Sequence, residues 1–198
     1  CMAKNLKFIC SGGMEGECRI WEMKSREMVS HLKEHTHKVS KVMLWHDDLH
    51  LVSASRDKAL LLWDLKTEKR VSAHIQRMGG INSFDLIPDS QLIVSTGQDR
   101  KVTLWDLRQA NAAKVVDTNN NPKKPDECHS ISMSHDGKMF ATGGSEQIVR
   151  LWDLGTLKCI EEGGGHSGTI NSVAFSYDDK QVISGGRDGS IFLWNIYA

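Results

Sequence analysis

Short apolar runs, each bounded by Gly, Asp, Asn or Ser, recur along the whole chain. Runs of this length between turn residues such as Pro88-Asp89-Ser90 and Asp136-Gly137 predict β-strands. In LLLWDL (60–65) the alternation of apolar and polar residues is blurred, as expected for a strand buried on both faces. The pattern predicts an all-β protein, with strands that include 19–23, 27–32, 39–44, 49–53, 59–64, 81–86, 92–95, 101–106, 130–134, 139–142, 149–153, 170–175 and 190–195.

The runs belong to a repeat. Five tryptophans are separated by 42, 42, 47 and 42 residues, an acid stands six residues before each of them, and a hydroxyl residue stands four before each acid. Five matches at three linked positions are far beyond chance. The tryptophans are Trp21, Trp63, Trp105, Trp152 and Trp194; the acids are Glu15, Asp57, Asp99, Glu146 and Asp188; the hydroxyls are Ser11, Ser53, Ser95, Thr142 and Ser184.

A period in the low forties with four strand-like runs per unit is typical of a β-propeller. The residue after each tryptophan completes the dipeptides WE, WD, WD, WD and WN. On these motifs the chain resembles the WD40-repeat family over essentially all of its length. The resemblance implies four-stranded blades around a central channel.

The register predicts one incomplete propeller domain, 1–198, of about four and a half blades, with repeats near 1–33, 34–75, 76–117, 118–163 and 164–198. The first repeat lacks its innermost strand and the last its outermost, so we expect the chain to be part of a seven-bladed propeller. The longer interval between Trp105 and Trp152 is taken up by a polar loop, DTNNNPKKP (117–125).

Composition narrows the classes of partner and the compartment that we expect. Lys+Arg and Asp+Glu both number 25, which disfavours nucleic acid and anionic membranes as partners. The five cysteines form no CxxC pair, a pattern that suits free thiols in a reducing compartment. The sequence has no run of 18 apolar residues of the kind that predicts a transmembrane helix. We expect a cytoplasmic protein.

The resemblance also implies a buried hydrogen-bonded chain from indole to hydroxyl to imidazole to carboxylate. It falls on Trp63, Ser53, His35 and Asp57, and on Trp194, Ser184, His166 and Asp188. The third and fourth repeats keep Ser95, Asp99 and Trp105, and Thr142, Glu146 and Trp152, but have Arg77 and Lys124 at the histidine position.

A Ser/His/Asp set could also be a catalytic triad. A nucleophilic serine must be exposed and usually sits on a strained turn, whereas most of these hydroxyls end an apolar strand and recur in every repeat. A structural role is therefore predicted, with no catalytic residue. His31, His35 and His37 lack an acid or cysteine to complete a metal set, and Gly163-Gly164-Gly165 lacks the Lys-Ser/Thr of a phosphate loop. No metal, cofactor or small-molecule substrate is expected.

In the WD40 family, ligands usually bind the face that carries the turns between second and third strands. The resemblance places Lys38, Arg56, Asn82, Gln98, Asn171 and Arg187 there, with Met14 and Ser145 at equivalent positions. Arginine at such positions suits acidic or phosphorylated partners, because its fork binds carboxylate or phosphate bidentately.

A narrower resemblance rests on SGGMEGECRIWEM, VSASRDKALLLWDL, TGQDRKVTLWDL, TGGSEQIVRLWDL, GGGHSGTI and DGSIFLWNIYA. In this order they are similar to the C-terminal propeller of cilia- and flagella-associated WD-repeat proteins of axonemal doublet microtubules; the inserted NNNPKKP loop departs from that pattern. The resemblance implies a non-enzymatic scaffold with protein partners, such as tubulin or axonemal proteins, in the cilium or flagellum. The alternative is a cytosolic adaptor in ubiquitin ligation, trafficking or RNP assembly.

Overall fold

The structure is a computed structural model, and it describes residues 1–3, 6–109, 112–117 and 127–196. These residues form 18 strands in five antiparallel sheets, which confirms the predicted all-β fold class. None of them forms a helix long and apolar enough to cross a membrane. The loop predicted at 117–125 and Lys124 lie, apart from Asp117, outside the described residues.

Each sheet is a meander in which consecutive strands pair, and we number the sheets as blades 1 to 5. Blade 1 holds β1 (Phe8–Gly12), β2 (Glu17–Glu22) and β3 (Met28–Lys33). Blade 2 holds β4 (Val39–Leu44), β5 (His50–Ser55), β6 (Ala59–Asp64) and β7 (Lys69–Ile75). Blade 3 holds β8 (Ile81–Leu86), β9 (Leu92–Gly97), β10 (Lys101–Asp106) and β11 (Ala112–Asp117). Blade 4 holds β12 (Cys128–Met133), β13 (Met139–Gly144), β14 (Ile148–Asp153) and β15 (Cys159–Gly164), and blade 5 holds β16 (Ile170–Phe175), β17 (Gln181–Gly186) and β18 (Ile191–Asn195).

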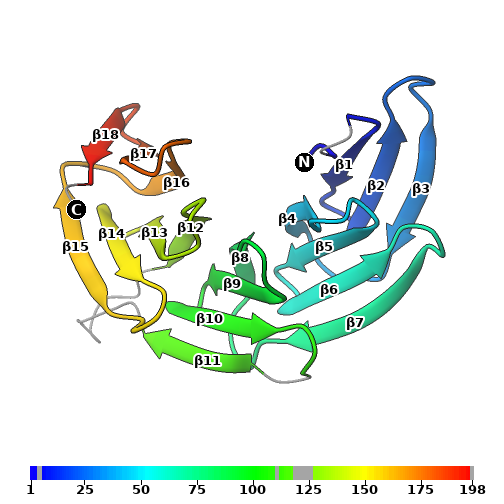
Figure 1. The fold of residues 1–198 in the computed structure, drawn as a ribbon, viewed down its shortest axis with the longest axis horizontal. Helices are drawn as coiled ribbons and strands as arrows, with labels where there is room; N and C mark the ends of the chain where they lie inside the picture. Colours follow the sequence, from blue (N-terminus) through cyan, green and yellow to red (C-terminus); the bar gives the residue numbers. More distant parts are fainter. Residues whose placement is uncertain (4–5, 110–111, 118–126, 197–198) are drawn as a thin grey trace.

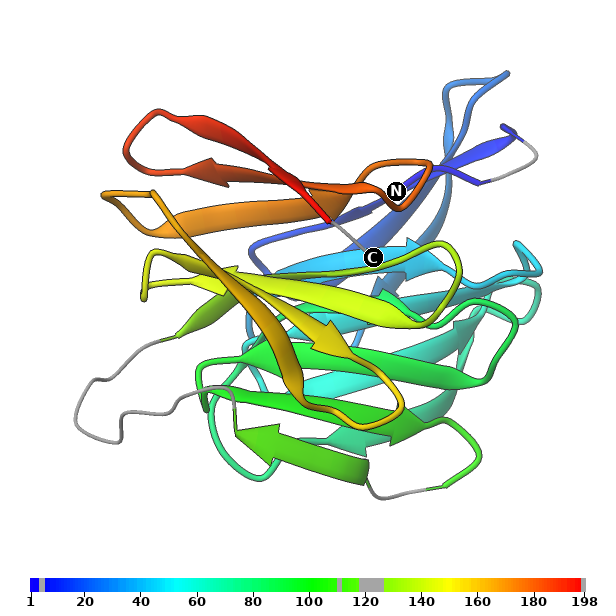
Figure 2. The ribbon, with the colours of Figure 1, turned by 60° about the vertical axis from the view of Figure 1, so that its left-hand side comes forward.

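The blades stand side by side in an arc around a central opening (Figure 1). The inner strands β4, β8, β12 and β16 border the opening, and β3, β7, β11 and β15 lie on the outside. The arc is open between blade 5 and blade 1 in this view, while Figure 2 shows the blades stacked as successive twisted layers.

Tight turns set the spacing of the strands within a blade. In every blade the residue that follows the repeat acid has a positive φ: Gly16, Lys58, Arg100, Gln147 and Gly189, with φ between 62° and 78°. This one left-handed residue reverses the chain at a fixed distance from the acid. The acid, the hydroxyl and the tryptophan therefore keep the same relative positions in each repeat.

The hydrophobic core lies between adjacent blades. Trp63, Trp105 and Trp152 are 2%, 2% and 5% exposed, and each is covered by the outer strand of the preceding blade. The covering residue is Leu32 for Trp63 and His74 for Trp105, whose rings meet edge to face with centroids 6.0 Å apart. For Trp194 it is Gly163, where an added Cβ would lie 2.8 Å from the indole. The glycine run at 163–165 thus allows the backbone to approach this indole closely.

Side chains also join the inner strands, which have no ladder of hydrogen bonds between blades. Ser40 Oγ donates to the carbonyl of Ile81 at 2.7 Å, and Asn82 Nδ2 donates to the carbonyl of Cys128 at 3.0 Å. The N–H of Val173 donates to Ser130 Oγ at 3.1 Å. These bonds fix the angle between neighbouring blades near the opening.

The outward faces of the end blades expose residues whose equivalents are buried inside the arc. Ile191 and Leu193 are 71% and 60% exposed, whereas Val149 and Leu151 at the same positions of blade 4 are 5% and 6% exposed. In blade 1, Trp21 is 37% exposed. The chain therefore presents two faces suited to packing against a further sheet.

Candidate functional site: the polar networks and the turn face

The Ser/His/Asp set of blade 2 forms one continuous buried chain. The Trp63 indole N–H donates to Ser53 Oγ at 2.8 Å, Ser53 Oγ lies 2.8 Å from His35 Nε2, and His35 Nδ1 lies 2.8 Å from Asp57 Oδ2. Because Ser53 Oγ accepts from the indole, its own proton points to Nε2, and the Nδ1–H of His35 donates to the carboxylate. The N–H groups of Thr36 and Ala59 also donate to Asp57, at 3.0 and 2.9 Å.

Blade 5 repeats this arrangement. Trp194 donates to Ser184 Oγ at 2.8 Å, and His166 joins Ser184 at 2.8 Å to Asp188 at 2.9 Å. The backbone N–H groups of Ser167 and Ser190 complete the coordination of Asp188. The eight residues assigned to the two networks from the sequence are thus brought together in two sets of four.

The hydrogen bonds lower the pKa of both carboxyl groups. Burial alone would raise the pKa of Asp57, but the bonds from Ala59, His35 and Thr36 outweigh it, so this pKa lies below its usual value. The bond from the Ser190 N–H, followed by those from His166 and Ser167, lowers the pKa of Asp188 to about 2 against the effect of burial. Both acids are therefore anions that are already bonded within their own blade.

These sets lack the geometry of a catalytic triad. Ser53 and Ser184 are 0% exposed, and each hydroxyl is already bonded to an indole and an imidazole. A nucleophile needs an open approach for the substrate carbonyl. The arrangement holds strands together and offers no reacting atom to a ligand.

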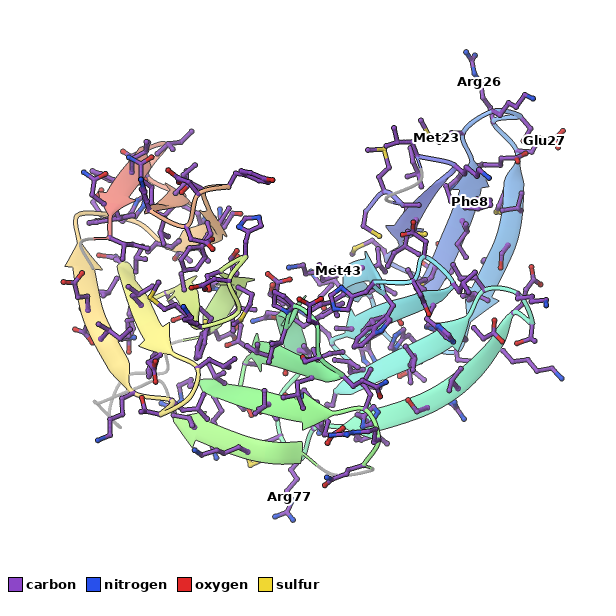
Figure 3. The ribbon with its side chains drawn as sticks, viewed as in Figure 1. Phe8, Met23, Arg26, Glu27, Met43 and Arg77 are labelled. Carbon is purple, nitrogen blue, oxygen red and sulfur yellow. The ribbon has the colours of Figure 1, made fainter. Side chains whose placement is uncertain are left out.

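Blades 3 and 4 keep the indole-to-hydroxyl bond without the histidine. Trp105 donates to Ser95 at 2.8 Å and Trp152 donates to Thr142 at 2.9 Å. Asp99 accepts from the Lys101 N–H at 3.3 Å. Arg77, which occupies the histidine position by spacing, is exposed and projects away from the sheets (Figure 3).

In blade 4 the repeat acid pairs with an arginine. Arg150 forms ion pairs with Glu146 and with Glu162, the latter at 2.8 Å, and its side chain is only 12% exposed. The repeat pattern did not identify Arg150. The sequence did contain a signal for this ion pair: a charged residue stands two positions before Trp152, where blades 2 and 5 have the apolar residues Leu61 and Phe192.

The other polar clusters considered from the sequence have structural explanations. His31 and His37 are exposed, both ring nitrogens of His35 are bonded within blade 2, and the described residues hold no group of three or more metal-ligating side chains. Burial raises the pKa of the Cys10, Cys18 and Cys128 thiols to about 11, which keeps them protonated. Trp45 is partly buried against the core between blades 2 and 3.

The turn residues before the repeat acids gather on one face. The N–H groups of Arg56, Gln98, Ser145 and Arg187 donate to the carbonyls of Lys38, Gly80, Glu127 and Thr169, at 3.2, 3.0, 2.9 and 2.8 Å. Each acceptor lies just before an inner strand, so these turns border the central opening. We refer to this surface as the turn face.

The side chains on the turn face are not equally available. Arg56, Arg187 and Asn171 are exposed, and Lys38 is half-buried. Gln98 accepts a hydrogen bond from the Gly80 N–H, and Asn82 is used to join blades 3 and 4. Both side chains thus make hydrogen bonds within the molecule, and their contact with a partner stays a prediction.

Antiparallel blades of three or four strands around a central opening, with an indole-to-hydroxyl hydrogen bond in blades 2 to 5, define a β-propeller. The family model described as "WD domain, G-beta repeat" matches residues 26–64, 66–106, 120–153 and 157–195. The chain belongs to the WD40-repeat family. The first, second and fourth matches each contain the outer strand of one blade and the three inner strands of the next, so the sequence repeat is offset from the blade by one strand. WD40 domains generally mediate protein–protein interactions and are typically non-enzymatic scaffolds.

Proposed function

We propose that this protein is a non-enzymatic scaffold of the ciliary or flagellar axoneme that binds tubulin or axonemal proteins through its turn face. The family supports the scaffold role, and the sequence motifs similar to cilia- and flagella-associated WD-repeat proteins support the location.

One observation carries the mode of action. The Ser/His/Asp sets are buried, while the exposed Arg56 and Arg187 lie on the turn face at the rim of the central opening. Chemistry that could recognise a partner is thus found at the surface, whereas the polar groups that resemble an active site hold the fold together.

Fractionation of flagellated cells tests the location. A tagged form of the protein is expressed, and axonemes are extracted first with detergent and then with high salt. A structural component is expected to remain in the axonemal pellet with the doublet microtubules. Release of most of the protein by detergent alone would favour the cytosolic adaptor and would contradict the axonemal proposal.

A further inference from the structure

A small pocket lies within blade 4, beside the repeat acid of that blade. Its volume is about 20 Å³, and the residues that line it include Thr142, Gly144, Glu146 and Arg150. A water molecule needs a space of roughly 10–15 Å³ measured in this way. The size therefore limits a ligand to about one heavy atom.

The pocket lies where blade 5 places its imidazole. The residues 42 positions after the four lining residues are Ser184, Gly186, Asp188 and Phe192, and all four surround His166. Ser184 Oγ and Asp188 Oδ2 lie 2.8 and 2.9 Å from the two ring nitrogens. The ring of Phe192 has its centroid 4.6 Å from that of the imidazole, and a Cβ added to Gly186 would lie 2.6 Å from Nδ1. In blade 4 the histidine position holds a lysine, so the same surroundings enclose no imidazole.

The buried hydroxyl of Thr142 has a proton to donate. Thr142 is 3% exposed, and its Oγ1 accepts a hydrogen bond from the Trp152 indole at 2.9 Å. No acceptor for its own proton is found among the residues that the structure describes. In blade 5 the equivalent proton points to His166 Nε2. A ligand in the pocket must therefore accept a hydrogen bond from Thr142.

The repeat acid sets the opposite requirement. Glu146 forms an ion pair with Arg150, which also pairs with Glu162, so its carboxylate is an acceptor only. A carboxylate offers about four acceptor positions, and the guanidinium leaves some of them to another donor. A metal ion or an ammonium ion cannot accept from Thr142, and a halide cannot donate to Glu146. Water can do both.

We propose that this pocket binds one ordered water molecule, which accepts the proton of Thr142 and donates to the carboxylate of Glu146. The hydrogen-bonded chain of blade 4 then runs from the Trp152 indole through the hydroxyl and the water to the acid, in the same direction as in blades 2 and 5. A water is shorter than an imidazole ring. The extra methylene of glutamate, compared with aspartate, brings the carboxylate closer to the hydroxyl. The site does not depend on the proposed scaffold function.

A crystal structure of the parent protein tests the site. At high resolution we expect one fully occupied water about 2.5–3.0 Å from Thr142 Oγ1 and at a similar distance from a carboxylate oxygen of Glu146. Thr142→Val removes the hydroxyl and should lose this water, whereas the matched control Thr142→Ser keeps the hydroxyl and should retain it.

Nuclear Overhauser transfer from water to the indole N–H groups tests the site in solution, on the parent protein alone. A long-lived water in the pocket should give a cross-peak at the Trp152 indole N–H. Trp63 is the control, because its partner Ser53 is bonded to an imidazole and both residues are buried. We expect no such cross-peak there.

Four results would overturn the proposal. Electron density between Thr142 and Glu146 that is absent, or that continues into a protein side chain, would leave no water site. A peak with about six oxygen ligands would indicate a bound cation. A water retained in Thr142→Val would show that the hydroxyl does not hold it. Equal cross-peaks at Trp152 and Trp63 would indicate general access of solvent to the blades.

Discussion

Replacing Asp57 with alanine removes the acid that closes the network of blade 2. The change deletes three hydrogen bonds, from the imidazole of His35 and from the N–H groups of Thr36 and Ala59. The serine, the indole and the strands themselves are left in place.

The magnitude follows from which donors lose their partner. The His35 side chain is 0% exposed, so its Nδ1–H would be unpaired in a buried site, at a cost of about 1–3 kcal/mol. The two backbone N–H groups can reach water, and losing their acceptor costs about 0.5 kcal/mol each. The free energy of unfolding should fall by about 2–4 kcal/mol, which for a chain of this size lowers the Tm by roughly 4–16 °C.

The assay is urea and thermal unfolding followed by circular dichroism, with Asp99→Ala as the matched control. Asp99 is the equivalent acid of blade 3, where the histidine position holds the outward-pointing Arg77. Asp99→Ala breaks no bond between a buried imidazole and the repeat acid, so we expect a smaller loss than in Asp57→Ala. Equal losses in the two variants would refute the claim that the imidazole-to-acid bond carries most of the effect.

The same network predicts a dependence on pH. Since the pKa of Asp57 is lower in the folded protein than in the unfolded chain, its carboxylate stabilises the fold fully above the unfolded pKa, about 3.9. This contribution is lost as the pH falls through the folded pKa. The stability difference between the parent protein and Asp57→Asn should persist from pH 7 to 5 and shrink below about pH 4. A difference that has vanished by pH 5 would contradict the assignment.

Three further predictions use other parts of the structure. Gly163→Ala should lower the free energy of unfolding by about 1–3 kcal/mol, because its Cβ would lie 2.8 Å from the Trp194 indole, while Gly164→Ala, with no atom within 4 Å, should be close to neutral in the same unfolding assay. A fluorophosphonate probe should label neither Ser53 nor Ser184 by mass spectrometry, since both hydroxyls are buried and bonded; stoichiometric labelling of either would reopen the catalytic interpretation. Light scattering should detect concentration-dependent association, because the end face of blade 5 is apolar and exposed, and Leu193→Lys should reduce it. A protein that is monomeric at all concentrations would contradict the prediction that this face associates with another chain.

The repeat spacing was sufficient to predict thirteen of the 18 strands and the relative positions of the hydroxyl, acid and tryptophan. Five strands, among them β4 and β10, begin and end at the predicted residues, and the other eight predicted strands differ by one or two residues at an end. The strands β1, β7, β11, β15 and β17 were not predicted. The agreement has a physical cause, since a tight turn with one left-handed residue after the acid fixes the distance between these groups.

Spacing could not predict contacts that join different blades. The sequence places Arg77 at the histidine position, but nothing in the pattern indicates that it would point outward or that Arg150 would pair with two glutamates.

Axonemal retention of a turn-face double variant tests the central claim, that the protein acts as a scaffold through this surface. Tagged parent protein and Arg56→Gln/Arg187→Gln would be compared in detergent- and salt-extracted axonemes, after confirming that the two have the same Tm. We expect the parent protein in the axonemal pellet and most of the double variant in the extract. Equal retention of both proteins would show that the arginines of the turn face do not hold the partner.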